Sequence, residues 1–452
     1  MIVVKFGGTS VADAAAIGRA VEIVRGRLAR RPLVVVSALS GTTNALLAIA
    51  EQSAKGQLIG ALRGVETLRD RHLHVAEALL GSGATESEVA GDLSAFFDEL
   101  ASLAEALSVL GHLTPRSLDA IASIGEQLSA RLVVAVMRER GIDADLVDAG
   151  DVMRTDDRFT RAEPMLEAIA DAAQRVLRPI LAAGGVPVVG GFIGATSHGV
   201  TTTLGRGGSD YSASLLGSAL LAEAIEIWTD VDGMLTADPR VVHDARLIEV
   251  IRFDEASELA SFGAKVLHPS TIAPAVRLGI PVFIYNSVRP EGRGTRITFE
   301  APRRAASAIA GKHDATVIKV RSPRMLLAHG FLRTIFEIFE RHRTSVDVVA
   351  TSEVSVSVTV DDVTHLEALL VDLRSLGDVS VERNRGIVAL VGAGLGDSSA
   401  AMARALGALG DIKVHMLSLS ASGINLTMLV DGDQVDPAIR RLHHAFFASA
   451  MS

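Results

Sequence analysis

The chain has 452 residues, which is too long for one ordinary domain, so we expect two or three domains. Hydrophobic residues make up 48% and charged residues 21%, a balance that supports packed cores and excludes extended disorder. The formal net charge of -9, with one Trp and two Tyr, argues against a nucleic-acid binder. The absence of cysteine excludes disulfides, zinc–thiolate sites and thiol catalysis.

The N-terminal segment places a lysine inside an apolar run. Residues 2–6, Ile-Val-Val-Lys-Phe, predict a buried strand, and Gly7 and Gly8 follow directly. An unpaired ammonium is rare in a buried strand, and glycines after a strand let the backbone approach a ligand closely. We therefore expect Lys5 to meet a phosphate group.

The same segment lacks the pattern of a signal peptide, so we expect a cytoplasmic protein. One apolar stretch, residues 179–195, resembles a membrane span in composition, but it is short and contains two prolines and five glycines. It fits a strand and loop in a protein core better. No membrane association is expected.

Short aliphatic runs alternate with helical patterns over the first two thirds of the chain. The runs predict strands at residues 33–37, 186–190, 225–229 and 281–285. The helical patterns lie at residues 15–30, 117–138 and 210–224, with a wholly helical excursion at 56–111. Strands separated by helices predict an α/β fold with a mainly parallel sheet between helical layers.

The last third has shorter units. A charged stretch of small residues, 300–314, is typical of a linker. After it, segments 345–352 and 413–420 occupy corresponding places in two small α+β modules of the order βαββαβ, which indicates an internal duplication. We predict domains at residues 1–300, 313–384 and 385–452.

A second glycine-rich loop precedes the helical pattern at 210–224. It reads Thr-Leu-Gly-Arg-Gly-Gly-Ser-Asp over residues 203–210. Backbone N–H groups and the dipole at a helix N-terminus favour an anion, and Arg206 offers a bidentate guanidinium for carboxylate or phosphate. Neither this loop nor Gly7-Gly8 is a Walker motif or a dinucleotide fingerprint.

Other candidate residues have two readings on sequence grounds. Thr229, Asp230 and Arg240 belong to a segment that holds a nucleotide or forms a solvated acidic turn. Lys265 stands beside a Gly and before a helical pattern, which on its own favours a surface lysine. Glu126 lies among apolar neighbours on a helix, and it either binds a substrate ammonium or is a plain surface glutamate. Thr43 either donates a hydrogen bond to a carboxylate or only stabilises a turn.

Seven segments together resemble the aspartate kinase family, within the wider amino-acid kinase fold. They span nearly all of the first 300 residues in the family's order: KFGGTS, VVVSALSGTTN, SIGEQLSARL, TDDRF, TTTLGRGGSDYSA, TDVDGMLTADPR and FGAKVLHP. The resemblance implies transfer of the ATP γ-phosphoryl, with Mg²⁺, to the β-carboxylate of L-aspartate, giving 4-phospho-L-aspartate. This is the first step of the biosynthesis of the aspartate-family amino acids.

The resemblance also implies roles for individual residues. Lys5 and Asp210 are catalytic, and no side chain is assigned as a metal ligand. Substrate contacts fall on Ser37, Thr43, Glu126, Arg206, Gly207 and Ser209. Nucleotide contacts fall on Lys5, Gly7, Gly8, Thr229, Asp230, Arg240 and Lys265. Leu235 stands where the family commonly has Tyr, so a hydroxyl contact to the nucleotide is expected to be missing.

The two C-terminal modules resemble ACT domains, which in this family bind regulatory amino acids between subunits. Segments 325–332, 345–347 and 351–353 are similar to the lysine-responsive branch, although Ala328 replaces a residue that is often polar there. The resemblance implies a homodimer or larger oligomer inhibited by L-lysine. The expected effector contacts are Met325, Gly330, Phe331, Leu332, Val346, Asp347 and Ser352.

Two other functions remain open. A degenerate kinase fold kept as an amino-acid sensor would not need Lys5, Arg206 and Asp210 together. A related kinase of a different carboxylate is the alternative within enzymes, and Glu126, Thr43 and the paired ACT modules argue against it.

Overall fold

A computed structural model describes residues 1–262, 269–326 and 329–448. Its internal contacts divide the chain into two compact units. The first unit comprises residues 1–234 and 266–299, and the second comprises residues 235–265 and 300–452.

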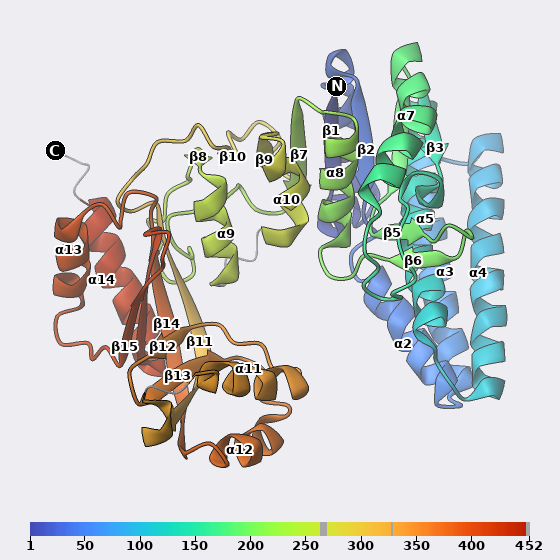
Figure 1. The fold of residues 1–452 in the computed structure, drawn as a ribbon. Helices are drawn as coiled ribbons and strands as arrows, with labels where there is room; N and C mark the ends of the chain where they lie inside the picture. The colour runs from blue at the N-terminus through green and yellow to red at the C-terminus, as the bar shows by residue number, and fades with distance from the viewer. Residues whose placement is uncertain (263–268, 327–328, 449–452) are drawn as a thin grey trace. The chain divides into compact units, whose positions relative to one another are not determined.

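The first unit is built on a mainly parallel sheet in the order β3-β4-β2-β1-β7-β9-β10 (Figure 1). Each neighbouring pair from β3 to β9 is parallel, and β10 runs antiparallel to β9. The bounds are β1 (Ile2–Phe6), β2 (Pro32–Val36), β3 (Ala144–Val147), β4 (Val186–Gly190), β7 (Ala224–Thr229), β9 (Val282–Asn286) and β10 (Thr295–Ile297). The predicted mainly parallel sheet is confirmed.

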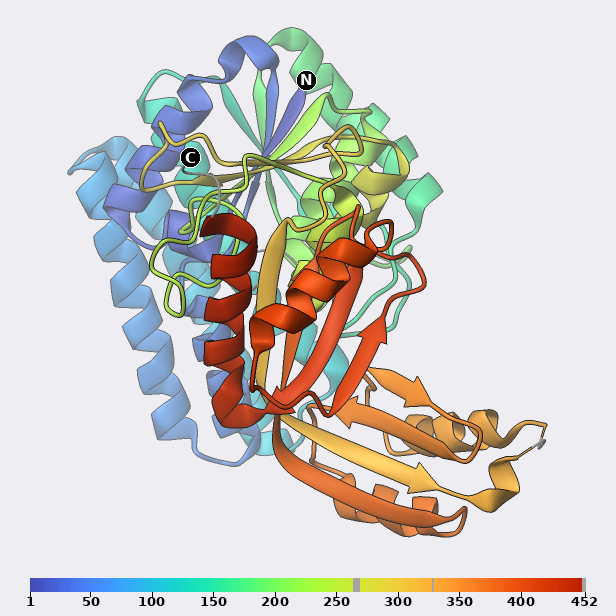
Figure 2. The same cartoon turned by 90° about the vertical axis from the view of Figure 1, so that its left-hand side faces the viewer.

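Helices cover both faces of this sheet, because its central strands are apolar on both sides. The blue and cyan helices α1–α5 lie on one face, and the green helices α7 and α8 lie on the other (Figure 2). The bounds are α1 (Ala14–Arg25), α2 (Thr42–Ala54), α3 (Leu58–Leu80), α4 (Ala84–Leu110), α5 (Pro115–Glu139), α6 (Ala149–Val152), α7 (Leu166–Ala183), α8 (Gly208–Ala219) and α10 (Pro269–Arg277). A two-stranded ribbon, β5 (Ile193–Ala195) and β6 (Thr201–Thr203), completes the unit.

The helical excursion expected at residues 56–111 is confirmed as α3 and α4, which pack against α2 and α5. Within the described residues, α5 is the helix with the length and apolar composition of a membrane span, and most of it is buried in the first unit. It therefore forms part of this unit's core.

The second unit contains an antiparallel sheet in the order β12-β13-β11-β14-β16-β15. Two strands, β11 (Ala308–Arg321) and β14 (Asp378–Val391), pair along most of their length at the centre. The others are β12 (Val349–Thr351), β13 (Ser355–Val360), β15 (Met416–Leu419) and β16 (Asn425–Asp431). The unit's helices are α9 (Phe253–Ser261), α11 (Phe331–Arg341), α12 (Leu366–Arg374), α13 (Ser399–Leu409) and α14 (Val435–Phe447), beside the short strand β8 (Val250–Ile251).

The internal duplication appears as two hydrophobic cores on one sheet. Helices α11 and α12 pack over one core, and α13 and α14 over the other. The long central strands β11 and β14 contribute to both cores. The first half of β11 pairs with residues 387–391 of β14, and its second half pairs with residues 378–382. Residues 313 and 385 lie inside these shared strands, and the three domain limits stay a prediction.

The linker expected at residues 300–314 is shorter in the structure, because β11 already begins at Ala308. The stretch reads as a linker because its residues are small and charged. Ala308 and Ile309 are nevertheless buried, since they pair with Val391 and Leu390 of β14.

Candidate active site

A cavity of about 770 Å³ opens in the first unit at the carboxyl ends of β1, β2 and β7. Ligands bind in this place in open α/β sheets, because loops from several strands converge there. Twelve of the predicted site residues line it: Lys5, Gly7, Gly8, Ser37, Thr43, Glu126, Arg206, Gly207, Ser209, Asp210, Thr229 and Asp230. The fold thus brings together segments that lie more than 200 residues apart in the sequence.

The centre of the cavity is an ion pair. Nζ of Lys5 lies 2.6 Å from Oδ1 of Asp210. Lys5 is only 7% exposed, and like Val3 it points from β1 toward α8, whose first turn carries Asp210. The carboxylate compensates the cost of burying the ammonium, as buried charges require.

The loop after β1 is held close to the neighbouring strands. The N–H of Gly7 donates to the carbonyl of Trp228 at 2.9 Å. A Cβ at Gly8 would lie 3.0 Å from the carbonyl oxygen of Ala38, so a larger residue would not fit without a shift. Ser10, which sequence reasoning did not assign, anchors the loop, because its Oγ lies 3.0 Å from the carbonyl oxygen of Trp228 and 2.7 Å from Oγ of Ser287.

The glycine-rich loop leads into α8 through two left-handed glycines. Gly205 and Gly207 have φ angles of 76° and 73°, a conformation that glycine adopts without a Cβ clash. Helix α8 then begins at Gly208, so the backbone N–H groups of its first turn face the cavity edge. The side chain of Arg206 is exposed there and is available to an anion.

Gly191 is a site residue that sequence reasoning missed. A Cβ at this position would lie 2.8 Å from Cβ of Ser209, which is closer than real atoms pack. The strand β4 can therefore approach the helix start only because position 191 has no side chain. The sequence signal was the pair Gly190-Gly191 at a strand end.

Glu126 is buried, so the reading of a plain surface glutamate is wrong. It is 4% exposed on α5, and its Oε2 has no hydrogen-bond partner among the described residues. Burial raises the pKa of Glu126 to about 8, against the opposing effects of the Ala38 backbone N–H and of Lys5. A buried carboxyl of this kind, facing a cavity, suits a ligand that brings its own positive charge.

Thr43, Thr229 and Asp230 lie at the edge of the cavity. Thr43 belongs to the first turn of α2, beside the loop that contains Ser37. Oγ1 of Thr229 donates to Oδ1 of Asp230 at 3.2 Å, and the carbonyl of Thr229 accepts the Ser287 N–H at 2.8 Å. These residues offer hydroxyl and carboxylate groups where β7 ends.

Two predicted nucleotide contacts, Arg240 and Lys265, stay predictions. Arg240 belongs to the second unit, is 86% exposed and pairs with Asp238, with 2.6 Å between its Nη2 and Oδ2 of the aspartate. That contact lowers the pKa of Asp238. Lys265 lies outside the described residues.

The predicted effector residues all lie in the second unit. Gly330, with φ of 82°, precedes α11, which begins with Phe331 and Leu332. Met325 ends a short 3-10 helix. Val346 packs against the core under α11 and α12, and Oγ of Ser352 lies 2.7 Å from Oγ of Ser355.

Asp347 has a cationic partner that the sequence did not indicate. Its Oδ2 lies 3.3 Å from Nζ of Lys312, which also contacts Asp361. Burial raises the pKa of Asp347; Lys312 opposes this shift, and the neighbouring Asp361 adds to it. An ammonium is therefore already placed between two carboxylates at this position.

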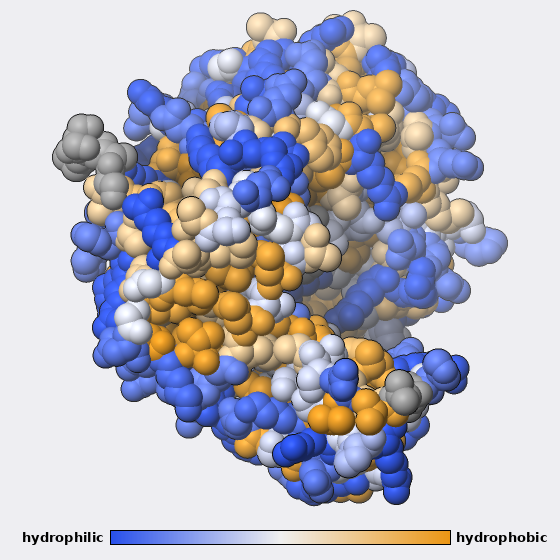
Figure 3. Space-filling model, turned by 60° about the vertical axis from the view of Figure 1, so that its left-hand side comes forward, coloured by the Kyte–Doolittle hydropathy of each residue, from blue (hydrophilic) through white to orange (hydrophobic). Residues whose placement is uncertain are grey.

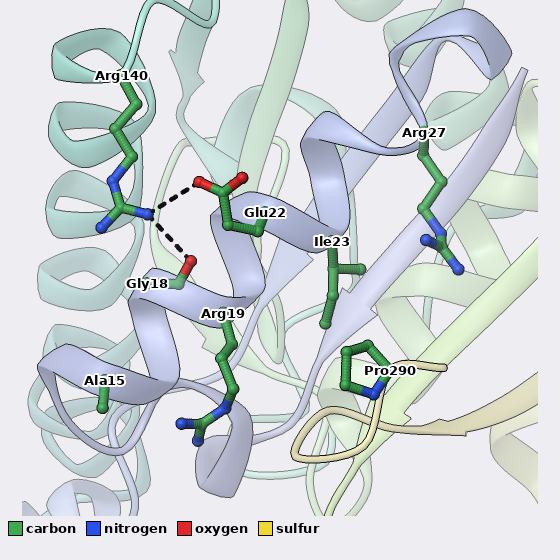
Figure 4. Close-up of a pocket in the computed structure, with 8 residues that line it drawn as sticks. All are labelled: Ala15, Gly18, Arg19, Glu22, Ile23, Arg27, Arg140 and Pro290. Carbon is green, nitrogen blue, oxygen red and sulfur yellow. Dashed lines mark hydrogen bonds and ion pairs between the residues drawn. The ribbon is translucent and has the colours of Figure 1, made fainter. Parts of the chain in front are cut away.

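A second cavity of about 450 Å³ lies along α1 and contains none of the predicted site residues (Figure 4). Arg140 spans one wall by donating to Oε1 of Glu22 at 3.2 Å and to the carbonyl of Gly18 at 3.1 Å. Arg27 points away toward Glu226, to which its Nε donates at 2.6 Å. Of the three arginines that line this second cavity, Arg27 and Arg140 thus form hydrogen bonds within the protein.

Comparison with known proteins identifies the family of the chain. The Amino acid kinase family matches residues 1–286, and an ACT domain matches residues 388–446. The chain is 40% identical over 456 residues to the lysine-sensitive aspartokinase 3 of Escherichia coli, covering 99% of both chains. It is 34% identical to the chloroplastic aspartokinase 3 of Arabidopsis thaliana, covering 98% of this chain and 81% of that protein.

The chain belongs to the aspartokinase family. The crystal structure of E. coli aspartokinase III in complex with aspartate and ADP is similar to it with a TM-score of 0.85, at 39% identity over 99% of this chain and 100% of that chain. The same enzyme in complex with lysine and aspartate gives a TM-score of 0.83 and covers 99% of each chain. Like other aspartokinases, the chain is a kinase that uses ATP to phosphorylate aspartate, and the expected amino-acid kinase fold followed by ACT domains is confirmed.

Proposed function

We propose that the larger cavity transfers the γ-phosphoryl of ATP to the β-carboxylate of L-aspartate, giving 4-phospho-L-aspartate. The Lys5–Asp210 pair is the observation that carries this assignment. A carboxylate acceptor is ionised at neutral pH, so the reaction needs no general base. It needs instead two anions held against each other and the charge of the moving phosphoryl neutralised.

Lys5 supplies positive charge to the transferring group, and Asp210 holds the lysine in place. On the aspartate side, Arg206 and Thr43 suit a carboxylate, and Glu126 suits the ammonium. Ser37, Gly207 and Ser209 complete that side of the cavity. Gly7, Gly8, Thr229 and Asp230, which also line the cavity, are the proposed nucleotide contacts. Arg240 and Lys265 are further proposed contacts.

Mg²⁺ fits this cavity as an ion that arrives with the nucleotide. Among the described residues no three acidic or histidine side chains form a cluster that could hold a metal. Mg²⁺ in kinases takes one or two carboxylates, the substrate phosphates and water, and Asp210 and Asp230 are carboxylates in the cavity wall. When bound, the ion would neutralise phosphate charge.

We also propose that L-lysine inhibits the enzyme through the second unit. The E. coli relative is named lysine-sensitive and was crystallised with lysine. The N–H groups of Gly330, Phe331 and Leu332 suit the effector carboxylate, because they open the N-terminus of α11. Asp347 suits an ammonium. Met325, Val346 and Ser352 would complete this site.

A homo-oligomer formed through the ACT modules would cover exposed sheet edges. Strand β15 is an edge of the six-stranded sheet, and its Leu417 and Leu419 are 46% and 42% exposed. Figure 3 shows hydrophobic surface gathered over this part of the second unit. Exposed edges with apolar side chains are usually paired or covered, so we propose a homodimer in the cytoplasm.

An acceptor assay tests the function directly. Purified protein with ATP and Mg²⁺ is offered aspartate, glutamate or acetylglutamate, and the acyl phosphate is trapped with hydroxylamine. We expect hydroxamate to form with aspartate and not with the other two acceptors. Adding lysine should reduce the amount formed. Turnover of another acceptor in preference to aspartate would indicate a different amino-acid kinase, and no turnover at all would indicate a sensor.

A further inference from the structure

Asp119 is a buried carboxylate in the wall of the larger cavity. It lies on α5, about two helical turns before Glu126, so both side chains project from the same face of the helix. Oδ1 accepts from Oγ1 of Thr203 at 2.6 Å. Oδ2 accepts the backbone N–H groups of Thr160 at 2.8 Å and Thr203 at 3.1 Å.

The two partners of Asp119 belong to loops that shape the cavity. Thr203 ends β6, directly before the glycine-rich loop with Arg206. Thr160 has a φ of 70°, a costly conformation for a β-branched residue, and it persists only where surrounding bonds hold it. The carbonyl of Thr160 lies 3.2 Å from the position of a Cβ at Gly205, so the two loops touch.

We propose that Asp119 is a positioning residue for aspartate phosphorylation, because it ties the Thr160 loop to the glycine-rich loop and so sets where Arg206 meets the substrate. The carboxylate itself is occupied by three protein donors and does not take part in phosphoryl transfer. Its effect reaches the reaction through Thr203 and the loop that follows. The inference rests on the proposed contact between Arg206 and aspartate.

Two substitutions at position 119 separate this role from packing. Asp119→Leu keeps the branched shape and the number of heavy atoms, although its methyl groups are larger than oxygens, and it removes all three acceptor contacts. Asp119→Asn keeps an oxygen for the two N–H groups, and its amide can donate to Oγ1 of Thr203. We expect the leucine variant to raise the KM for aspartate roughly tenfold or more while the KM for ATP changes little, because a misplaced contact residue weakens productive binding. The asparagine variant should restore most of the loss.

Thr155→Val provides the matched control. Oγ1 of Thr155 lies 2.6 Å from Oγ1 of Thr202 of β6 and donates to the carbonyl of Asp156 at 2.9 Å, so the substitution breaks two side-chain hydrogen bonds next to the same ribbon without touching Asp119. We expect a similar loss of thermal stability and an unchanged KM for aspartate. An equal rise of this KM in the control would overturn the inference, as would a folded leucine variant with the KM of the wild type.

Thr203→Val keeps the proposal testable if the leucine variant does not fold. It removes the Oγ1 bond alone, and the KM for aspartate should rise about threefold, since one of three contacts is lost. An unchanged value in a folded protein would contradict the inference. Failure of the wild type to phosphorylate aspartate would instead contradict the proposed function, so the two failures are distinguishable.

Discussion

Asp210 Oδ1 and Lys5 Nζ lie 2.6 Å apart, although the two residues are separated by most of the first unit's sequence. Lys5 comes from a buried strand and Asp210 from the first turn of α8. The contact explains how the lysine can be buried before nucleotide arrives. It also places the ammonium beside the glycine-rich loop, where a phosphoryl group would be transferred.

Asp210→Asn should slow catalysis by about 10²- to 10³-fold, because the ammonium that neutralises developing charge is no longer held in place. The variant also leaves Lys5 without its counter-charge, and we expect a loss of about 3 kcal/mol in the free energy of unfolding. Steady-state kinetics and chemical denaturation measure the two effects. The double variant Lys5→Met/Asp210→Asn should recover part of the lost stability and none of the activity. If its loss in the free energy of unfolding equals the sum of the losses of the two single variants, the two residues do not interact.

Glu126 should make the binding of aspartate depend on pH. Its pKa of about 8 means that it is mostly protonated at neutral pH, and the proton must leave before the carboxylate can pair with a substrate ammonium. We expect the KM for aspartate to fall as pH rises from 6 to 8, by up to about tenfold per unit, and then to level off. Glu126→Gln should flatten this profile and raise the KM. The same pH dependence in both proteins would argue against the assignment.

The same shift has a consequence for stability without substrate. Because the pKa of Glu126 is raised from 4.5 to about 8, the folded state holds a proton that the unfolded state lacks across that range. Stability from this group is therefore complete below pH 4.5 and is lost as pH rises toward 8, by at most about 1.4 kcal/mol per unit. Denaturation curves at several pH values, compared with those of Glu126→Gln, isolate this contribution.

Gly191→Ala should impair activity although it adds a single methyl group. The new Cβ would lie 2.8 Å from Cβ of Ser209, so α8 and its glycine-rich loop would have to move away from β4. We expect kcat/KM for aspartate to fall about 10²-fold. Gly407→Ala is the matched control, since no atom lies within 4 Å of its Cβ, and it should leave activity unchanged. Normal kinetics of the Gly191 variant would mean that this close approach is dispensable.

Lys312→Met should make the enzyme more sensitive to lysine. In the structure, Nζ of Lys312 lies 3.3 Å from Oδ2 of Asp347, where the effector ammonium is proposed to bind. Removing this competitor should lower the lysine concentration for half inhibition by roughly fivefold, which corresponds to about 1 kcal/mol for a partly exposed pair. Lys319→Met, on the same strand, removes the ion pair with Glu382 and should leave the lysine concentration for half inhibition unchanged. Weaker inhibition of the Lys312 variant would indicate that this lysine supports the site.

The catalytic cavity was largely predictable because its residues occupy contiguous motifs. Lys5 in an apolar strand and Asp210 after a run of glycines are unusual choices for their local structure, and the structure pairs them; their catalytic roles stay a prediction. The burial of Glu126 was not decidable, since an amphipathic pattern does not reveal that α5 is covered by its neighbours. Asp119 was not singled out in the sequence, because only the fold brings it to Thr160 and Thr203.

The second unit was less predictable, because its strands are shared between modules. Residues 308–312 looked like linker, yet their partners lie in β14 nearly 80 residues away. In segment 345–352 the regular strand begins only at Val349. Asp347 and Val348 both bond to Thr359 of β13, so two residues face one and the pairing is irregular before that point. The contact between Lys312 and Asp347 therefore depends on strand pairing that no local sequence pattern indicates.

The Lys5–Asp210 site is proposed to phosphorylate aspartate. The decisive measurement compares wild type with Lys5→Met for aspartyl phosphate formation from ATP and aspartate, after circular dichroism has established that both are folded. We predict that the wild type forms the product and that the variant forms it at least about 10³-fold more slowly. A folded Lys5→Met protein with near-normal turnover would contradict the claim.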